Sequence, residues 1–202
     1  MKKVLIAILI FSVIILTGCK SEGSYRAEAI TKSDPAVCYN INDQAIRNDC
    51  FWEVAKITKN PGLCHVIMIS DTRENCLKEM ALAQMDDAMC ATLTNKTIKG
   101  SCYIHIASKK NDISICDKID FSDDLVGKPK EFCYGEIAMR SVDPTICERI
   151  IDQTMTNLCY DKVIGQIGQG RIDRATCEKI NDQKTKDYCY HSLASRERLK
   201  TQ

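Results

Sequence analysis

The chain has 202 residues, 45% hydrophobic and 27% charged, so it is long enough for one domain or repeat array and too apolar to be disordered. Its formal net charge of +1 shows no excess of basic residues for binding nucleic acid, so we expect no nucleic-acid partner. Aromatic residues make up only 6% and glycine and proline are sparse, which favours helices over a β-sandwich. The thirteen cysteines are unusual, and they indicate metal binding in a reducing compartment or disulfides in an oxidising one.

The first residues have the organisation of a secretory signal peptide. Lys2 and Lys3 precede an apolar run over 4–16, which is too short for an ordinary membrane-spanning helix. The run leads into LTGC, residues 16–19, which resembles the lipobox of prokaryotic lipoproteins. The resemblance implies cleavage before Cys19, a diacylglycerol on its thiol, and a fatty acid such as palmitate on its new amino group.

The predicted chain therefore begins with a signal peptide over 1–18, followed by a lipidated N-terminus and tether over 19–32. Loss of Lys2 and Lys3 reduces the 28 basic residues to 26 against 27 acidic ones, so the mature chain carries about −1. Membrane attachment would rest on the acyl chains rather than on attraction to anionic lipid. With Lys20 after the cysteine, the lipoprotein sorting pattern implies the outer membrane in a Gram-negative host. In other hosts we expect the outer face of the cytoplasmic membrane.

After Cys19, twelve cysteines recur with a regular spacing. Separations of 12 and 14 residues alternate, which gives a period of 26 with two interruptions. A fixed period in this range is typical of a solenoid of repeats. The cysteines fall into six successive pairs, numbered here as repeats one to six: Cys38 and Cys50, Cys64 and Cys76, Cys90 and Cys102, Cys116 and Cys133, Cys147 and Cys159, and Cys177 and Cys189.

Each first cysteine is predicted to lie on a short amphipathic helix. Four residues before it stands an Asp or Asn, a residue type that caps helices by accepting a hydrogen bond from a free N–H group. These six N-caps are Asp34, Asn60, Asp86, Asp112, Asp143 and Asp173. Proline follows the cap in three repeats, where its missing N–H costs nothing. An aliphatic residue three after the cysteine completes the inward face.

Each second cysteine is predicted to lie on a longer helix of about four turns. Apolar residues follow it at offsets of 1, 4 and 5, which is a helical stripe rather than a strand alternation. The residue at offset 5 is alanine in five of six repeats, which suits close helix packing. The tyrosines at offset 1 resemble an aromatic ligand-binding row, but their phase beside the cysteine favours packing between repeats.

The spacing also predicts which cysteines pair. The first cysteine lies roughly four residues before the turn of the hairpin and the second about six after it, so at about 1.5 Å per residue they are nearly level. Pairing with the first cysteine of the next repeat would fit less well. The second cysteine lies about nine residues before the end of its helix, whereas the next first cysteine lies about four residues beyond the junction. We therefore predict a disulfide within every repeat.

These patterns predict an all-α fold: an α-solenoid of six helical hairpins of about 26 residues over 33–202, each linked by one disulfide. The plan resembles the disulfide-linked helical repeats of Sel1-like, Helicobacter cysteine-rich proteins. The family's repeats are longer and its cysteines closer together, so the resemblance implies no ligand or activity for this chain.

Two insertions interrupt the period. Repeat four has five extra residues within 120–132, and we interpret its acidic residues as a solvated turn. Four extra residues in GQIGQGR, Gly165–Arg171, separate repeats five and six, and we predict a frayed helix end or a hinge there because three glycines weaken a helix. Insertions in solenoids map to loops, often on a binding face.

No catalytic or metal-binding motif is visible in the sequence. His65, His105 and His191 occupy different places in their repeats, and the C-x-x-C spacing of zinc sites is absent. We therefore expect no catalytic residue, no metal site and no cofactor. The predicted function is that of an envelope lipoprotein whose repeats bind or scaffold a protein or glycan partner. Two alternatives stay open: a metal-thiolate protein for zinc or copper, and a small envelope hydrolase using carboxylates.

The lipid anchor is directly testable. Cys19→Ser removes the only thiol that the lipobox resemblance assigns to acylation, so lipid labelling and retention in the membrane fraction should both be lost. Labelling with a fatty-acid analogue and fractionation measure this. Unchanged membrane retention of the variant would contradict the prediction.

Overall fold

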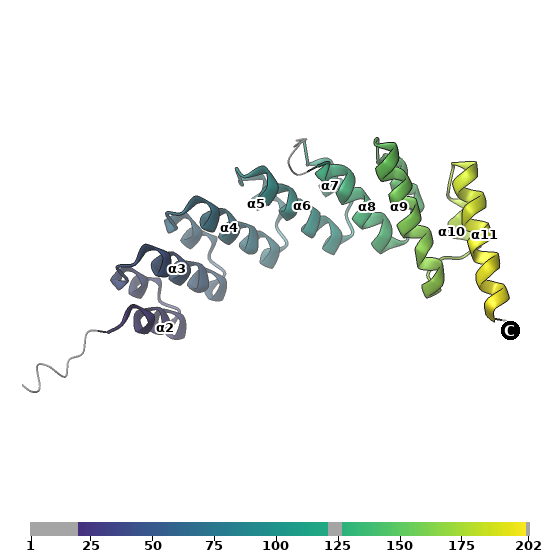
Figure 1. Cartoon of the computed structure of the whole chain (residues 1–202). Helices are drawn as coiled ribbons and strands as arrows, with labels where there is room; N and C mark the ends of the chain where they lie inside the picture. The colour runs from purple at the N-terminus through teal and green to yellow at the C-terminus, as the bar shows by residue number, and fades with distance from the viewer. Residues whose placement is uncertain (1–19, 121–126, 201–202) are drawn as a thin grey trace, which may run out of the picture. The chain divides into compact units, whose positions relative to one another are not determined.

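The computed structural model describes residues 20–120 and 127–200, and the chain is all-α over these residues (Figure 1). It divides into two compact units, one ending at Cys76 and the other beginning at Leu77, within helix α4. The predicted signal peptide and Cys19 lie outside the described residues. The first unit contains α2 (Glu22–Lys32), η1 (Pro35–Asn40), α3 (Gln44–Thr58), η2 (Pro61–Val66) and the beginning of α4 (Ser70–Gln84).

The second unit continues the same alternation of short and long helices. It contains α5 (Asp87–Ala91), α6 (Lys96–Lys110), α7 (Ser114–Asp117), α8 (Pro129–Ser141), η3 (Pro144–Arg149), α9 (Gln153–Ile164), η4 (Gly165–Gln169), α10 (Arg174–Glu178) and α11 (Gln183–Lys200). The prediction of a short helix followed by a longer one in every repeat is confirmed. The three short helices that begin with proline, η1, η2 and η3, are 3₁₀ helices, whereas α5, α7 and α10 are α-helical.

All twelve cysteines after Cys19 form the predicted disulfides within repeats. The bonds are Cys38–Cys50, Cys64–Cys76, Cys90–Cys102, Cys116–Cys133, Cys147–Cys159 and Cys177–Cys189. Their Cα–Cα distances are 5.6–5.7 Å, and the cysteines are 0–3% exposed. Each bridge closes a loop whose cross-linking contributes about 3 kcal/mol in the chain-entropy model.

A recurrent junction connects the long helix of one repeat to the short helix of the next. The residue after the long helix has left-handed backbone geometry, with φ of 53–56°, at Ser33, Lys59, Met85, Asn111 and Val142. The following Asp or Asn donates its N–H to the carbonyl of the alanine five residues earlier, at 2.9–3.1 Å. These alanines are Ala29, Ala55, Ala81, Ala107 and Ala138, all fully buried. The geometry is that of a Schellman motif, which turns the chain sharply while satisfying the last carbonyl groups.

The Asp or Asn four residues before each first cysteine is the N-cap of the short helix, as predicted, in five repeats, whereas α7 begins after Ile113, one residue beyond Asp112. The Asp or Asn side chain accepts a hydrogen bond from a backbone N–H two or three residues ahead in all six repeats. A second set of caps was missed by sequence reasoning. Asp43, Asn95, Asp152 and Asp182 begin the long helices and accept from N–H groups three residues ahead.

The predicted tether over 19–32 is wrong for most of its length. Glu22–Lys32 form helix α2, which packs on η1 and α3 rather than extending freely. The Glu22 carboxylate accepts hydrogen bonds from the backbone N–H groups of Asn42 and Asp43, at 3.1 and 3.0 Å. This contact ties α2 to the turn of the first hairpin.

Helix α2 is the long helix of a repeat that lacks its disulfide. Ala29 stands five residues before the cap Asp34, as Ala55 stands five before Asn60. In this register Ser24 occupies the place of the second cysteine. The cysteine spacing therefore could not reveal this half-repeat, although the buried alanine and the cap were present in the sequence.

The junction geometry predicts that glycine is preferred at position 142. Val142 is β-branched and adopts φ of 56°, a conformation that costs an L-residue roughly 1–2 kcal/mol. Val142→Gly should therefore raise the free energy of unfolding by about 1 kcal/mol. Denaturant unfolding with the disulfides intact measures this change.

Arg140→Gly is the matched control, because Arg140 is exposed and lies within helix α8. It should lower the free energy of unfolding by up to about 1 kcal/mol, since glycine is unfavourable in a helix. The same sign for both variants would contradict the assignment of left-handed strain to Val142.

Candidate functional site

The second insertion is ordered and forms part of the core. The prediction of a frayed helix end or hinge at Gly165–Arg171 is wrong, because Gly165–Gln169 form the 3₁₀ helix η4 directly after α9. Ile167 and, just beyond the insertion, Ile172 are 4% and 3% exposed. Burial of these two isoleucines offsets the weak helix propensity of the three glycines.

The last helix packs against this insertion. Helix α11 contacts η4 and α10, and it also reaches α9. Gly170 has φ of 75°, and a Cβ atom there would lie 2.7 Å from Nη2 of Arg196 on α11. Position 170 therefore favours glycine for its backbone conformation, whereas the Arg196 guanidinium, at the end of a flexible side chain, could move away from a Cβ atom. Helix α11 contacts α9 less extensively than α8 does.

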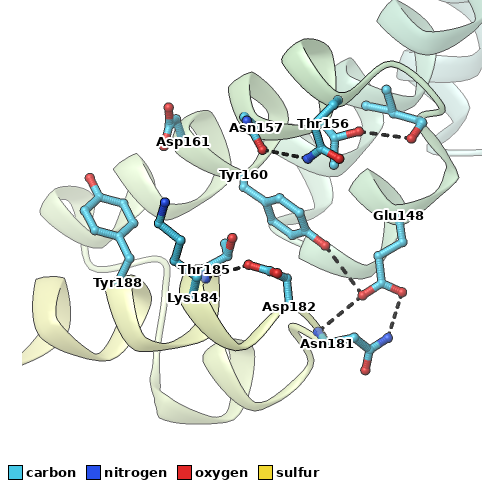
Figure 2. A pocket seen from close by; sticks show the side chains of 12 residues that line it. Glu148, Thr156, Asn157, Tyr160, Asp161, Asn181, Asp182, Lys184, Thr185 and Tyr188 are labelled. Carbon is cyan, nitrogen blue, oxygen red and sulfur yellow. Dashed lines mark hydrogen bonds between the residues drawn. The ribbon is translucent and has the colours of Figure 1, made fainter.

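An open groove of about 760 Å³ lies between α9 and α11 (Figure 2). This volume is within the range of about 300–1,000 Å³ found for small-molecule sites. We call it the α9/α11 groove. Its α9 side is a polar stripe of residues spaced three and four apart, and these are Gln153, Thr156, Asn157, Tyr160 and Asp161.

Glu148 organises one end of the groove. Its carboxylate accepts hydrogen bonds from the Asn181 backbone N–H at 3.3 Å and from the Asn181 side-chain amide at 2.8 Å. The Tyr160 hydroxyl donates to the same carboxylate at 3.5 Å, as Figure 2 shows. Glu148 thereby connects repeat five to the turn of repeat six.

The pairing of Tyr160 with Glu148 belongs to a pattern shared by the last three repeats. In each, the tyrosine after the second cysteine donates its hydroxyl to the acid after the first cysteine. The other pairs are Tyr134 with Asp117 and Tyr190 with Glu178. Burial, followed by the charge of Glu148, raises the pKa of Tyr160 to about 12. Burial and the hydrogen bond to Asp117 raise the pKa of Tyr134 to about 12.

Residues of α11 and its N-cap line the opposite side of the groove. Asp182 caps this helix by accepting from the Thr185 N–H at 2.8 Å, and hydrogen bonds from Thr185 lower the pKa of Asp182. The Tyr188 ring is 53% exposed beside the groove. Lys184 also lines it, opposite Asp161 of α9 in Figure 2.

Two further depressions lie between the preceding long helices of the same unit. The one between α8 and α9 is small and mainly apolar, with Phe132 and Leu158 at its surface. The one between α6 and α8, about 500 Å³, contains Lys109 and Arg140. Phe132, Leu158 and Tyr188 each directly precede a second cysteine and are 47–53% exposed, so they lie at the same place in their repeats.

The described part of the chain contains no cluster of three His, Cys, Asp or Glu side chains that could hold a metal ion. The three histidines lie on separate helices, η2, α6 and α11. Within residues 20–120 and 127–200, no helix has the length and apolar character needed to cross a membrane. No family model, curated protein or solved structure matches this chain.

The predicted site residues and the groove are largely separate. The twelve paired cysteines are buried within the repeats, and Cys159 alone borders a depression, that between α8 and α9. Sequence reasoning missed the residues that form the groove, among them Glu148, Tyr160 and Tyr188. The insertion after Ile164 was the available signal, since it marked the place where repeat packing changes.

The raised tyrosine pKa values predict a loss of stability in alkali. A tyrosine whose pKa rises from 10 in the unfolded chain to about 12 in the folded one stabilises the fold below pH 10, and this contribution is lost between pH 10 and 12. Tyr160→Phe should reduce this pH dependence and remove one late-ionising phenol from an ultraviolet absorbance titration. A titration curve identical to that of the wild type would contradict the burial of Tyr160.

Proposed function

We propose that the protein is a lipid-anchored envelope protein whose repeats form a non-catalytic binding module. The lipobox-like residues 16–19 support the anchor. The six disulfides support an oxidising compartment, because such bonds are rare in the cytosol. The repeat architecture supports binding, since helical arrays present extended surfaces to partners.

The α9/α11 groove is the observation on which the binding function rests. It is open, it is of ligand size, and it lies where an insertion interrupts otherwise regular repeat packing. Its polar residues converge from η3, α9, the turn before α11 and α11 itself. Convergent polar groups in a depression of this size are a feature of small-molecule sites.

The arrangement does not favour the two alternatives. Metal binding by cysteine requires thiolates, and the twelve paired cysteines are engaged in disulfides. A hydrolase that uses carboxylates needs an acid and a base free to exchange protons with substrate. Glu148 and Asp182 instead hold neighbouring backbone N–H groups, and hydrogen bonds to Asp182 favour its ionised form.

Site-specific photo-crosslinking tests this function. A diazirine-bearing lysine analogue replaces Lys184 in the full-length protein, expressed in cells and irradiated before the membranes are isolated. We expect an adduct at position 184, because this side chain lines the groove. The matched control places the same analogue at Lys56, an exposed position on α3 outside the groove. No adduct at 184, or equal yields at both positions, would overturn the proposed binding site.

A further inference from the structure

We propose that the ligand of the α9/α11 groove is a neutral oligosaccharide. This inference rests on the proposed binding function and specifies its ligand class. The groove combines hydrogen-bonding amide and hydroxyl groups with an exposed aromatic ring, and hydrogen bonds within the protein occupy the carboxylates of Glu148 and Asp182. A sugar offers many hydroxyl groups on its edges and a C–H face that can lie against an aromatic ring.

Three carboxylates and one lysine line the groove, which disfavours an anionic ligand, and hydrogen bonds within the protein occupy two of the carboxylates. The Glu148 carboxylate is occupied by Asn181 and Tyr160, at distances of 2.8–3.5 Å. Asp182 is occupied by the N-terminus of α11, where a carboxylate also interacts favourably with the helix dipole. The remaining charged residues that line the groove are Asp161 and Lys184, which have opposite signs.

The polar stripe of α9 leaves donors and acceptors for hydroxyl groups. The Gln153 side-chain amide donates to the Asn157 side-chain oxygen at 3.0 Å. This bond uses one donor of Gln153 and one acceptor of Asn157, so the Asn157 amide donors and the Gln153 carbonyl oxygen have capacity for a ligand. A bidentate pattern of this kind suits adjacent hydroxyl groups, which each donate and accept.

Tyr188 supplies the apolar surface that a sugar ring needs. Its ring is half exposed beside the groove, whereas Tyr160 is 5% exposed and is fixed by Glu148. By contrast, the α9/α11 groove has little apolar surface for the large side chains that contribute most of the binding energy in protein interfaces. Ile150 is the one aliphatic residue that lines it, and Ile150 is 6% exposed.

Calorimetric titration of the full-length, detergent-solubilised protein tests the inference. The probes are cellotetraose, tetra-N-acetylchitotetraose and maltotetraose, each at low and high salt. We expect at least one to bind, with little dependence on salt because the ligand is uncharged. Tyr188→Ala should weaken binding by about tenfold, the effect of losing one aromatic contact.

Tyr39→Ala is the matched control, because Tyr39 is an exposed tyrosine outside the groove. It should leave saccharide affinity unchanged, and the disulfide-linked fold of both variants is checked by circular dichroism. Equal loss in Tyr188→Ala and Tyr39→Ala would overturn the assignment of the sugar to this groove.

The titration and the crosslinking experiment together distinguish failure of this inference from failure of the proposed binding function. If none of the three saccharides binds while an adduct still forms at position 184, the ligand is not a neutral oligosaccharide and the binding function stands. An adduct at 184 that a protease removes and a glycosidase does not would likewise overturn the inference, because it identifies a polypeptide. Absence of any adduct at 184 is the failure of the proposed function itself.

Discussion

The disulfide within each hairpin is the interaction on which the rest of the structure depends. The first helices contain only four to six residues, and helices this short are not stable by themselves in water. A covalent bond to the longer helix fixes each of them in place without a large apolar interface. The short helix can then devote its remaining surface to the long helix of the preceding repeat, as η1 does with α2 and η3 with α8.

A second constraint, the junction, sets how repeats follow one another. The left-handed residue, the alanine carbonyl and the Asp or Asn cap together satisfy the polar groups at the end of one helix and the beginning of the next. Because the alanine is both buried and an acceptor, a larger side chain would disturb packing and turn geometry together. The recurrence of the same three elements at Ser33 and Asp34 explains why α2 packs as a repeat even without cysteines.

Most of the fold could be predicted from the sequence because its contacts are local and recur with the repeat. Cysteine spacing, Asp and Asn caps and the stripe after each second cysteine predicted the hairpins and all six bonds, since each depends on contacts within one period. Helix α2 escaped because its cysteine place holds Ser24. The caps such as Asp43 were present in the sequence, two residues after the recurring aliphatic position that Ile41 occupies, but they were not assigned. The groove could not be predicted, because it depends on how α11 packs on η4 and α9. That packing includes the burial of Ile167 and Ile172, which outweighs glycine flexibility.

The placement of the disulfides also determines how the chain would respond to mechanical force. All six bonds lie inside repeats, so they interrupt the pulling path at intervals but do not join one hairpin to the next. Under tension the junctions can open and the segments between repeats can lengthen, while the segments between paired cysteines, which are 12 or 17 positions apart, remain closed loops. The two helices of each repeat would thus stay covalently connected under load, which favours refolding of the hairpin when the load is released.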